Sequence, residues 1–148
     1  MSEPFVPDHF DPPLSFHGPG FQLEPLGPAH NERDYEAWST SMDHIHATPG
    51  EWGTWPHPMT LEHNLDDLER HASDFAERRG FTYSVLDGST VIGCLYIYPD
   101  KDGGSDAHVE SWVRESRAEM DPVVWSAVSI WLREDWPFRS VRYAVRPG

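Results

Sequence analysis

Apolar residues recur every three or four positions along residues 60–79, which is the spacing of one face of a helix. Thr60 suits the N-terminal cap of that helix, and Gly80 suits its end. The apolar positions are Leu61, Leu65, Leu68, Ala72, Phe75 and Ala76. We therefore expect an amphipathic helix whose apolar stripe packs on the core and whose charged side chains face solvent.

Two further stretches have helical features. Residues 29–45 carry apolar side chains at helical spacing and are followed by Thr48-Pro49-Gly50, which ends a helix. A third helix is predicted from Asp121-Pro122 to about Asp135, because aspartate favours the cap position and proline the first turn. Trp136-Pro137 then stops it.

Strands are predicted from residues that alternate between apolar and polar, or that are apolar on both faces. The predicted strands are 21–26, 81–86, 91–98, 107–113 and 140–145. Asp87-Gly88-Ser89 is a hairpin turn, and strand 91–98 is apolar on both faces, which favours a central position. The element order is β-α-α-β-β-β-α-β, an α/β (α+β) fold with a mixed sheet and helices on both faces.

Residues 1–20 contain five prolines and no periodicity, which predicts an extended N-terminal arm followed by one domain over residues 21–148. Apolar side chains in the arm, Phe5, Phe10, Leu14 and Phe16, are expected to dock on the body or on a second subunit. The last predicted strand, 140–145, is a candidate sheet edge, so a homodimer is one expectation.

Composition limits the possible partners. The formal net charge is −14 over 148 residues, and a surface this acidic disfavours nucleic acid and anionic membranes. The single cysteine, Cys94, excludes an internal disulfide, and no apolar run has the length of a membrane span. We expect a cytoplasmic protein with a small-molecule ligand.

Several short phrases resemble the GNAT superfamily of acyl-CoA-dependent N-acyltransferases. They are VIGCLYIYP in the hairpin, WVR at the end of strand 107–113, WL near the end of the last helix, and WPF before the last strand. The resemblance spans about residues 21–146. It implies a GNAT-like fold and acyl transfer from an acyl-CoA-type donor to the amine of a small molecule.

The resemblance also places the donor between strand 107–113 and the next helix. The family holds the CoA pyrophosphate there with a Q/R-x-x-G-x-G/A loop, whose glycines let backbone N–H groups approach the ligand. The candidate donor-binding residues in this chain are Trp112, Val113, Arg114 and Arg117.

The corresponding segment here, RESRAEMDP, has no glycine. Pro122 lacks an N–H group, Glu115 and Glu119 add negative charge, and the Asp121 carboxylate is expected to cap the helix itself. The cofactor loop is therefore degenerate, and we predict weak or absent binding of acetyl-CoA or another acyl-CoA.

The resemblance makes strand 107–113 the border of the substrate site. Glu110 is the first candidate for a general base and His108 the second, and both share a strand face with Trp112. Tyr143 is a candidate proton donor. The alternative for Glu110 and His108 is a solvent-facing or charge-paired row, and the alternative for Tyr143 is a core tyrosine.

Neither the histidines nor the tryptophan-rich loop gives an unambiguous site. His44 and His46 point to different sides of a helix, and His63 and His71 are about 80° apart on another, so we predict no metal site. The loop 51–59 holds two tryptophans and is either one wall of a binding site or a loop whose rings are pinned to the core.

Two functions remain open from the sequence. One is a divergent acyltransferase that holds its donor in an unusual way. The other is a GNAT-fold module that does not acetylate and instead binds a small ligand or mediates dimeric interactions. The glycine-free loop favours the second function, and the resemblance favours the first.

Overall fold

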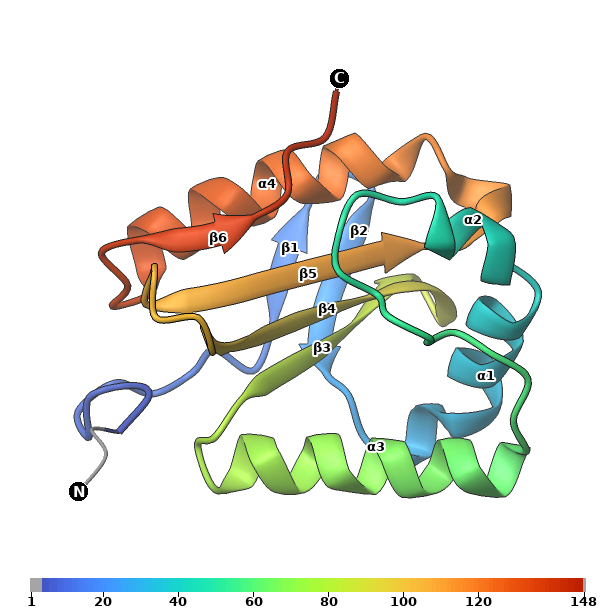
Figure 1. Cartoon of the computed structure of the whole chain (residues 1–148), viewed down its shortest axis with the longest axis horizontal. Coiled ribbons are helices and arrows are strands. Elements are labelled where there is room, and N and C mark those ends of the chain that lie inside the picture. The colour runs from blue at the N-terminus through green and yellow to red at the C-terminus, as the bar shows by residue number, and fades with distance from the viewer. Residues whose placement is uncertain (1–3, 148) are drawn as a thin grey trace.

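The computed structural model describes residues 4–147. They form one six-stranded sheet with the strands in sequence order (Figure 1). The strands are β1 (Phe16–Gly18), β2 (Phe21–Pro25), β3 (Phe81–Asp87), β4 (Thr90–Pro99), β5 (Ala107–Val113) and β6 (Val141–Tyr143). All neighbours are antiparallel except β5 and β6, which run parallel and are joined by a helix.

The helices cover both faces of this sheet. They are α1 (Asn31–Ser39), α2 (Met42–His46), α3 (Leu61–Ala76) and α4 (Met120–Asp135). Figure 1 shows α4 on one side of the sheet, with α3 and α1 on the other. The mixed sheet with helices on both faces is as predicted, and so is the central position of β3 and β4.

The single helix predicted over residues 29–45 is wrong. The chain forms a short 3-10 turn, then α1, then α2. Two side-chain bonds lie at the break: the hydroxyl of Thr40 donates to the Glu36 carbonyl (2.8 Å), and the hydroxyl of Ser41 accepts from the N–H of the distant Glu115 (2.9 Å). Such side-chain bonds to backbone compete with a continuous helix.

Two hydrophobic clusters lie on the two faces of the sheet. On the α4 face, Val124, Val128 and Trp131 pack against β3, β4 and β5. On the other face, Trp38 of α1, Leu68 of α3 and Trp112 of β5 form a second cluster. The tryptophans are therefore mainly core residues.

Residues 4–20 of the predicted arm lie against the body, while residues 1–3 are outside the described part of the chain. Phe5 stacks on Phe81, and Phe10 contacts the ring of Trp136. Arg78 fixes this segment by donating to the carbonyls of Pro7 (2.7 Å) and Phe10 (2.8 Å). Residues 16–18 of the arm form β1, which pairs with β2.

The apolar stripe of α3 is buried only in part. Leu68 is buried, but Leu61 is exposed, and Asn64 and His71 lie on the buried side. Charged side chains of this helix lie on the solvent side as expected, for example Asp66, Glu69 and Arg70, but the two polar residues on the buried side were not predicted. The polar residues on the buried side face a pocket, which makes α3 part of the candidate site rather than a scaffold alone.

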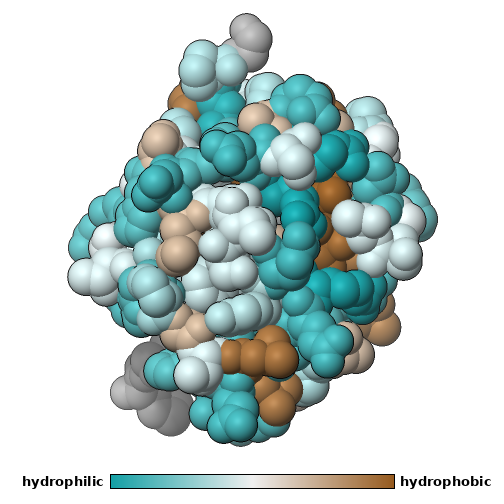
Figure 2. Space-filling model, turned by 90° about the vertical axis from the view of Figure 1, so that its right-hand side faces the viewer, coloured by the Kyte–Doolittle hydropathy of each residue, from teal (hydrophilic) through white to brown (hydrophobic). Residues whose placement is uncertain are grey.

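The outer surface carries few features. The face seen in Figure 2 is mostly hydrophilic, and its hydrophobic residues lie in separate small patches. Within residues 4–147, β6 has a strand neighbour on one side only.

No helix in the described part of the chain has both the length and the apolar character needed to cross a bilayer.

Candidate functional site

The alternation of β5 divides its side chains between the two faces of the sheet. Val109 and Val113 belong to the α4-side core, and Trp112 belongs to the opposite core. His108 and Glu110 share the face of Trp112, as predicted from their spacing. The structure therefore brings together His108, Glu110 and Trp112 on the side away from α4.

The third candidate catalytic residue, Tyr143, lies elsewhere. It is the register partner of Val109 and contacts Trp125 of α4 and the hydroxyl of Ser111 (2.5 Å). Burial raises the pKa of its hydroxyl well above the usual range. The sheet separates Tyr143 from Glu110, so the structure does not assemble these two candidates into one site.

A pocket of about 480 Å³ opens beside Glu110, on the side of the sheet away from α4. Its walls come from α1, α3, β4, β5 and the loop 51–59. The lining residues are Leu26, Asp34, Glu51, Trp52, Trp55, Asn64, Asp67, Leu68, Arg70, His71, Tyr96 and Glu110. We call this cavity the tryptophan pocket.

Glu110 sits at one side of the tryptophan pocket, next to His108. Glu110 Oε1 lies 3.0 Å from His108 Nε2 and accepts the backbone N–H of Glu51 at 3.2 Å. Burial raises the pKa of the Glu110 carboxyl, whereas burial and then the charge of Arg142 lower the pKa of His108. A carboxylate whose pKa is moved toward neutrality beside a neutral imidazole suits proton transfer.

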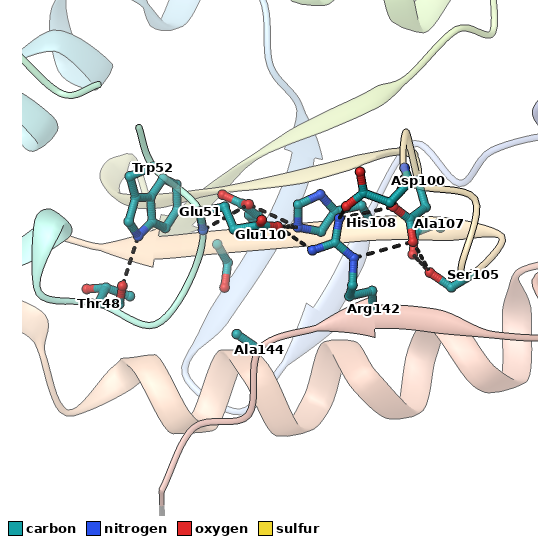
Figure 3. A network of polar contacts seen from close by, with 12 residues as sticks. Thr48, Glu51, Trp52, Asp100, Ser105, Ala107, His108, Glu110, Arg142 and Ala144 are labelled. Atoms are coloured by element: carbon teal, nitrogen blue, oxygen red, sulfur yellow. Dashed lines mark hydrogen bonds and ion pairs between the residues drawn. The ribbon is translucent and has the colours of Figure 1, made fainter. Parts of the chain in front are cut away.

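A row of charged groups continues from Glu110 along β5 (Figure 3). Arg142 on β6 is the register partner of His108, and its guanidinium bonds both Glu51 and Asp100. Ser105 also donates to Asp100, at 2.6 Å. These bonds hold the pKa of Asp100 well below its usual value, and the Arg142 bond likewise lowers the pKa of Glu51.

Glu51, His108 and Glu110 offer three metal-type ligand atoms within 4.8 Å of one another. Among residues 4–147, no other group of three such side chains has this spacing. The Arg142 guanidinium, however, already bonds Glu51 and supplies the positive charge that a metal ion would bring. The absence of a metal site stays a prediction.

A second carboxylate that lines the tryptophan pocket is buried. Asp34 of α1 is 4% exposed, and its Oδ2 accepts from Asn64 Nδ2 at 3.2 Å. Asn64 in turn accepts from Trp38 Nε1 at 3.0 Å, which fixes the orientation of its amide. Burial raises the pKa of Asp34 to about 6.

His71 of α3 forms another polar part of the pocket wall. Its Nδ1 lies 2.9 Å from the Tyr98 hydroxyl and 3.0 Å from the Thr82 hydroxyl. The Tyr98 hydroxyl donates to Asp74 at 2.8 Å. Burial, followed by the charge of Arg70, lowers the pKa of His71 to about 4, so the imidazole is neutral at pH 7.

The two tryptophans of loop 51–59 both line the pocket and are fixed to the body. Trp52 Nε1 donates to the Thr48 carbonyl at 2.9 Å. The ring of Trp55 has its centroid 5.6 Å from that of Trp38 and 6.2 Å from that of Trp112. The loop thus fits both interpretations given above: its rings are fixed to the body of the protein, and they also form one wall of the pocket.

Sequence analysis missed Asp34, Asn64, His71 and Tyr96 as pocket residues. A signal was present for two of them, since Asn64 and His71 lie four residues before and three residues after Leu68, on one face of α3. A buried apolar residue between two polar ones on the same face indicates a helix that borders a cavity. Asp34 carried no such signal, because its burial depends on α3 crossing α1.

The candidate donor-binding residues are engaged by the chain itself. Trp112 and Val113 are buried in the two cores. Arg114 pairs with Glu36 at 2.6 Å, and Arg117 pairs with Asp87 at 2.9 Å and with Glu119 at 3.1 Å. Each arginine that the sequence placed near a pyrophosphate already has a carboxylate partner.

The predicted capping role of Asp121 is wrong. Helix α4 begins at Met120, so Asp121 lies inside its first turn and makes no capping bond. Its Oδ2 instead accepts from Arg146 Nε at 2.7 Å. Arg146 is 4% exposed and also donates to the carbonyls of Ser111 (2.6 Å) and Ala144 (2.8 Å).

Arg146 thus fills the gap where β5 and β6 diverge, beyond their last register pair, Val109 and Tyr143. Ligands of sheets with parallel strands bind at the carboxyl ends of those strands, which is the end that Arg146 occupies. With Pro122 in the first turn of α4 as well, the residues of this segment do not fit a CoA pyrophosphate held in the usual way.

Comparisons with known proteins support the fold. No protein-family model and no curated protein matches the chain. Solved structures do match, and several of them are acetyltransferases. A putative ribosomal-protein-serine acetyltransferase from Vibrio cholerae aligns with a TM-score of 0.69 and 12% identity, over 96% of this chain and 76% of that one.

Two other matches were determined with bound ligands. RimJ of Mycobacterium smegmatis, in complex with CoA-disulfide, has a TM-score of 0.64 and 17% identity, over 99% of this chain and 71% of that one. The microcin C7 self-immunity acetyltransferase MccE, in complex with acetyl-CoA and AMP, has a TM-score of 0.61 and 13% identity, over 78% of this chain and 62% of that one. The chain therefore shares the GNAT fold of these structures.

Proposed function

We propose that this protein is related to N-acyltransferases and acts on the amine of a small molecule bound in the tryptophan pocket. The observation that carries the proposal is Glu110. It is a half-buried carboxylate with a raised pKa that projects from β5 into a cavity of ligand size. The GNAT fold supports it, because the matched structures are acetyltransferases.

In this proposal Glu110 acts as the proton acceptor. An alkylammonium group carries no free electron pair, so it must lose a proton before its nitrogen attacks an acyl carbon. His108 Nε2 lies 3.0 Å from Glu110 and 3.2 Å from Glu51, so it is placed to orient the Glu110 carboxylate, which releases the proton to solvent at the open side of the pocket. Tyr143 takes no part at this side of the sheet, because it faces α4.

Replacing Glu110 with glutamine is therefore expected to lower kcat for acylation of an amine about 10²- to 10⁴-fold, the usual contribution of a general base. The assay follows acyl transfer to a panel of small amines at millimolar acetyl-CoA. Glu69→Gln, on the exposed side of α3, is the matched control and should leave kcat unchanged. Equal rates for wild type and Glu110→Gln would contradict the assignment.

The alternative is a GNAT-fold module that binds a small ligand without transferring an acyl group. The donor side favours it, since Arg146 fills the gap between β5 and β6 and the cofactor loop has no glycine. Absence of acylation with every amine of the panel, in a protein that still binds amines, would decide for this alternative.

Self-association through β6 is part of the proposal. Within the described residues this strand has a free edge, and Val145 beside it is exposed. We propose a weak homodimer in the cytoplasm, in keeping with one buried, unpaired cysteine. Sedimentation that shows only monomer at about 50 μM, a concentration well above the Kd of a micromolar dimer, would contradict it.

A further inference from the structure

We infer that the tryptophan pocket selects an organic cation, with the positive charge held by Asp34 and by the faces of the tryptophan rings. The inference deepens the proposed function, on which its location rests, and it concerns recognition rather than transfer. It predicts which amines enter the pocket: those that are positively charged and carry a short apolar group.

The first support is the charge of the pocket wall. Four acidic side chains line the pocket: Asp34, Glu51, Asp67 and Glu110. Among the described lining residues, Arg70 is the one arginine or lysine. Arg70 pairs with Asp67 at 3.4 Å, and Arg142 pairs with Glu51. The negative charges of Asp67 and Glu51 are thus each neutralised by an arginine of the same chain.

The negative charge of Asp34 is not neutralised in this way. Within residues 4–147 it has no arginine, lysine or histidine partner, and its Oδ2 accepts one hydrogen bond from the neutral amide of Asn64. A buried carboxylate without a cation is costly, and a ligand cation within reach would recover part of that cost. Burial also raises the pKa of Asp34.

The carboxylate is also held in place. The amide of Asn64 accepts from Trp38 at 3.0 Å and donates to the side-chain oxygen of Asn31 at 2.9 Å as well as to Asp34. Because each bond fixes the next, the Asp34 carboxylate has a defined orientation at the pocket wall. Preorganised groups of this kind give binding sites their specificity.

The second support is the aromatic wall. Trp52 and Trp55 line the same cavity as Asp34, with their ring centroids 6.1 Å apart and 45° between the ring planes. The faces of tryptophan rings attract cations, most strongly where water is excluded. Leu26 and Leu68 complete the wall and offer an apolar surface for a short alkyl group.

The proposal is tested with butylammonium and 1-butanol as probes, because they have the same chain and differ in charge. Calorimetry at pH 8 keeps Asp34 ionised and the amine protonated. Wild-type protein is expected to bind butylammonium at least tenfold more tightly than 1-butanol. Asp34→Asn should remove this preference, whereas Asp66→Asn, on the exposed side of α3, should keep it.

A second variant covers the case in which Asp34→Asn does not fold. Trp52→Leu keeps an apolar wall but removes the ring, so it should weaken butylammonium binding more than 1-butanol binding. Equal affinities of wild type for the two probes would overturn the inference, as would a full preference in Asp34→Asn, or no binding of either probe at 50 mM. Failure of the proposed function appears separately, as absent acyl transfer with cation binding intact.

Discussion

Replacing Arg146 with alanine is expected to lower the free energy of unfolding by about 3–5 kcal/mol, the usual cost of breaking a buried ion pair. The side chain of Arg146 is 2% exposed and that of Asp121 is 17% exposed. Removing the guanidinium leaves the Asp121 carboxylate without its cation and the Ser111 carbonyl without one donor.

Urea unfolding measures this effect. Arg139→Ala is the matched control, since that side chain is exposed and is expected to matter by less than about 0.5 kcal/mol. The double variant Arg146→Met with Asp121→Leu should recover most of the loss, because an apolar pair of similar volume avoids the unpaired charge. A cost for Arg146→Ala equal to that of the control would show that the pair contributes nothing.

The same variants report on the acyl donor. Since the Arg146 side chain fills the gap between β5 and β6, wild-type protein should bind acetyl-CoA weakly or not at all, and Arg146→Ala, which opens this gap, should bind it more tightly. Calorimetry decides between the two proposed functions. A Kd of about 1 μM or tighter for the wild type, equivalent to about −8 kcal/mol, would contradict the prediction and favour an ordinary acyltransferase.

Strands β2 to β6 and their order were predictable from the sequence because their signals are local, whereas β1 was missed, since it lies in the segment predicted to be an extended arm. The hairpin of β3 and β4 depends on Asp87-Gly88-Ser89 and on continuous apolar runs. His108 and Glu110 were placed on one face because alternation along a strand needs no tertiary information. The break at Thr40 and Ser41 was missed, since it depends in part on a bond to the distant Glu115.

The parts of the site that sequence reasoning missed are held by contacts between distant segments. Asp34 and Asn64 are 30 positions apart, and Arg146 reaches Asp121 across 25 positions. A pattern of neighbouring residues cannot predict contacts between residues so far apart in the sequence. The capping role of Asp121 was predicted from the local sequence, whereas the structure pairs this carboxylate with the buried guanidinium of Arg146.

The pH dependence of stability provides the second large effect, through two buried groups that act in opposite directions. The pKa of Asp34 is raised to about 6 by burial, with a smaller contribution from Asp67. The folded protein therefore holds a proton there that the unfolded chain releases near pH 4. Between about pH 4 and pH 6, Asp34 makes stability fall as pH rises.

His71 has the opposite sign. Its pKa is lowered to about 4, chiefly by burial and secondly by Arg70, whereas the unfolded imidazole takes up a proton near pH 6.5. As pH falls from 6.5 to 4, the unfolded state binds a proton that the folded state does not, so stability falls as pH falls. In the wild type the two slopes are expected to cancel over most of this range.

Single variants should separate the two slopes. Asp34→Asn is expected to become less stable as pH falls from 6.5 to 4, and to exceed the wild type by up to about 3 kcal/mol at pH 7.5, because two pKa units correspond to that free energy. His71→Gln should show the reverse slope, losing stability as pH rises from 4 to 6. Urea midpoints at pH 4.5, 5.5, 6.5 and 7.5 measure both, with Asp66→Asn as the control. Curves for Asp34→Asn that run parallel to those of the wild type would show that Asp34 does not hold a proton in the folded protein between pH 4 and pH 6.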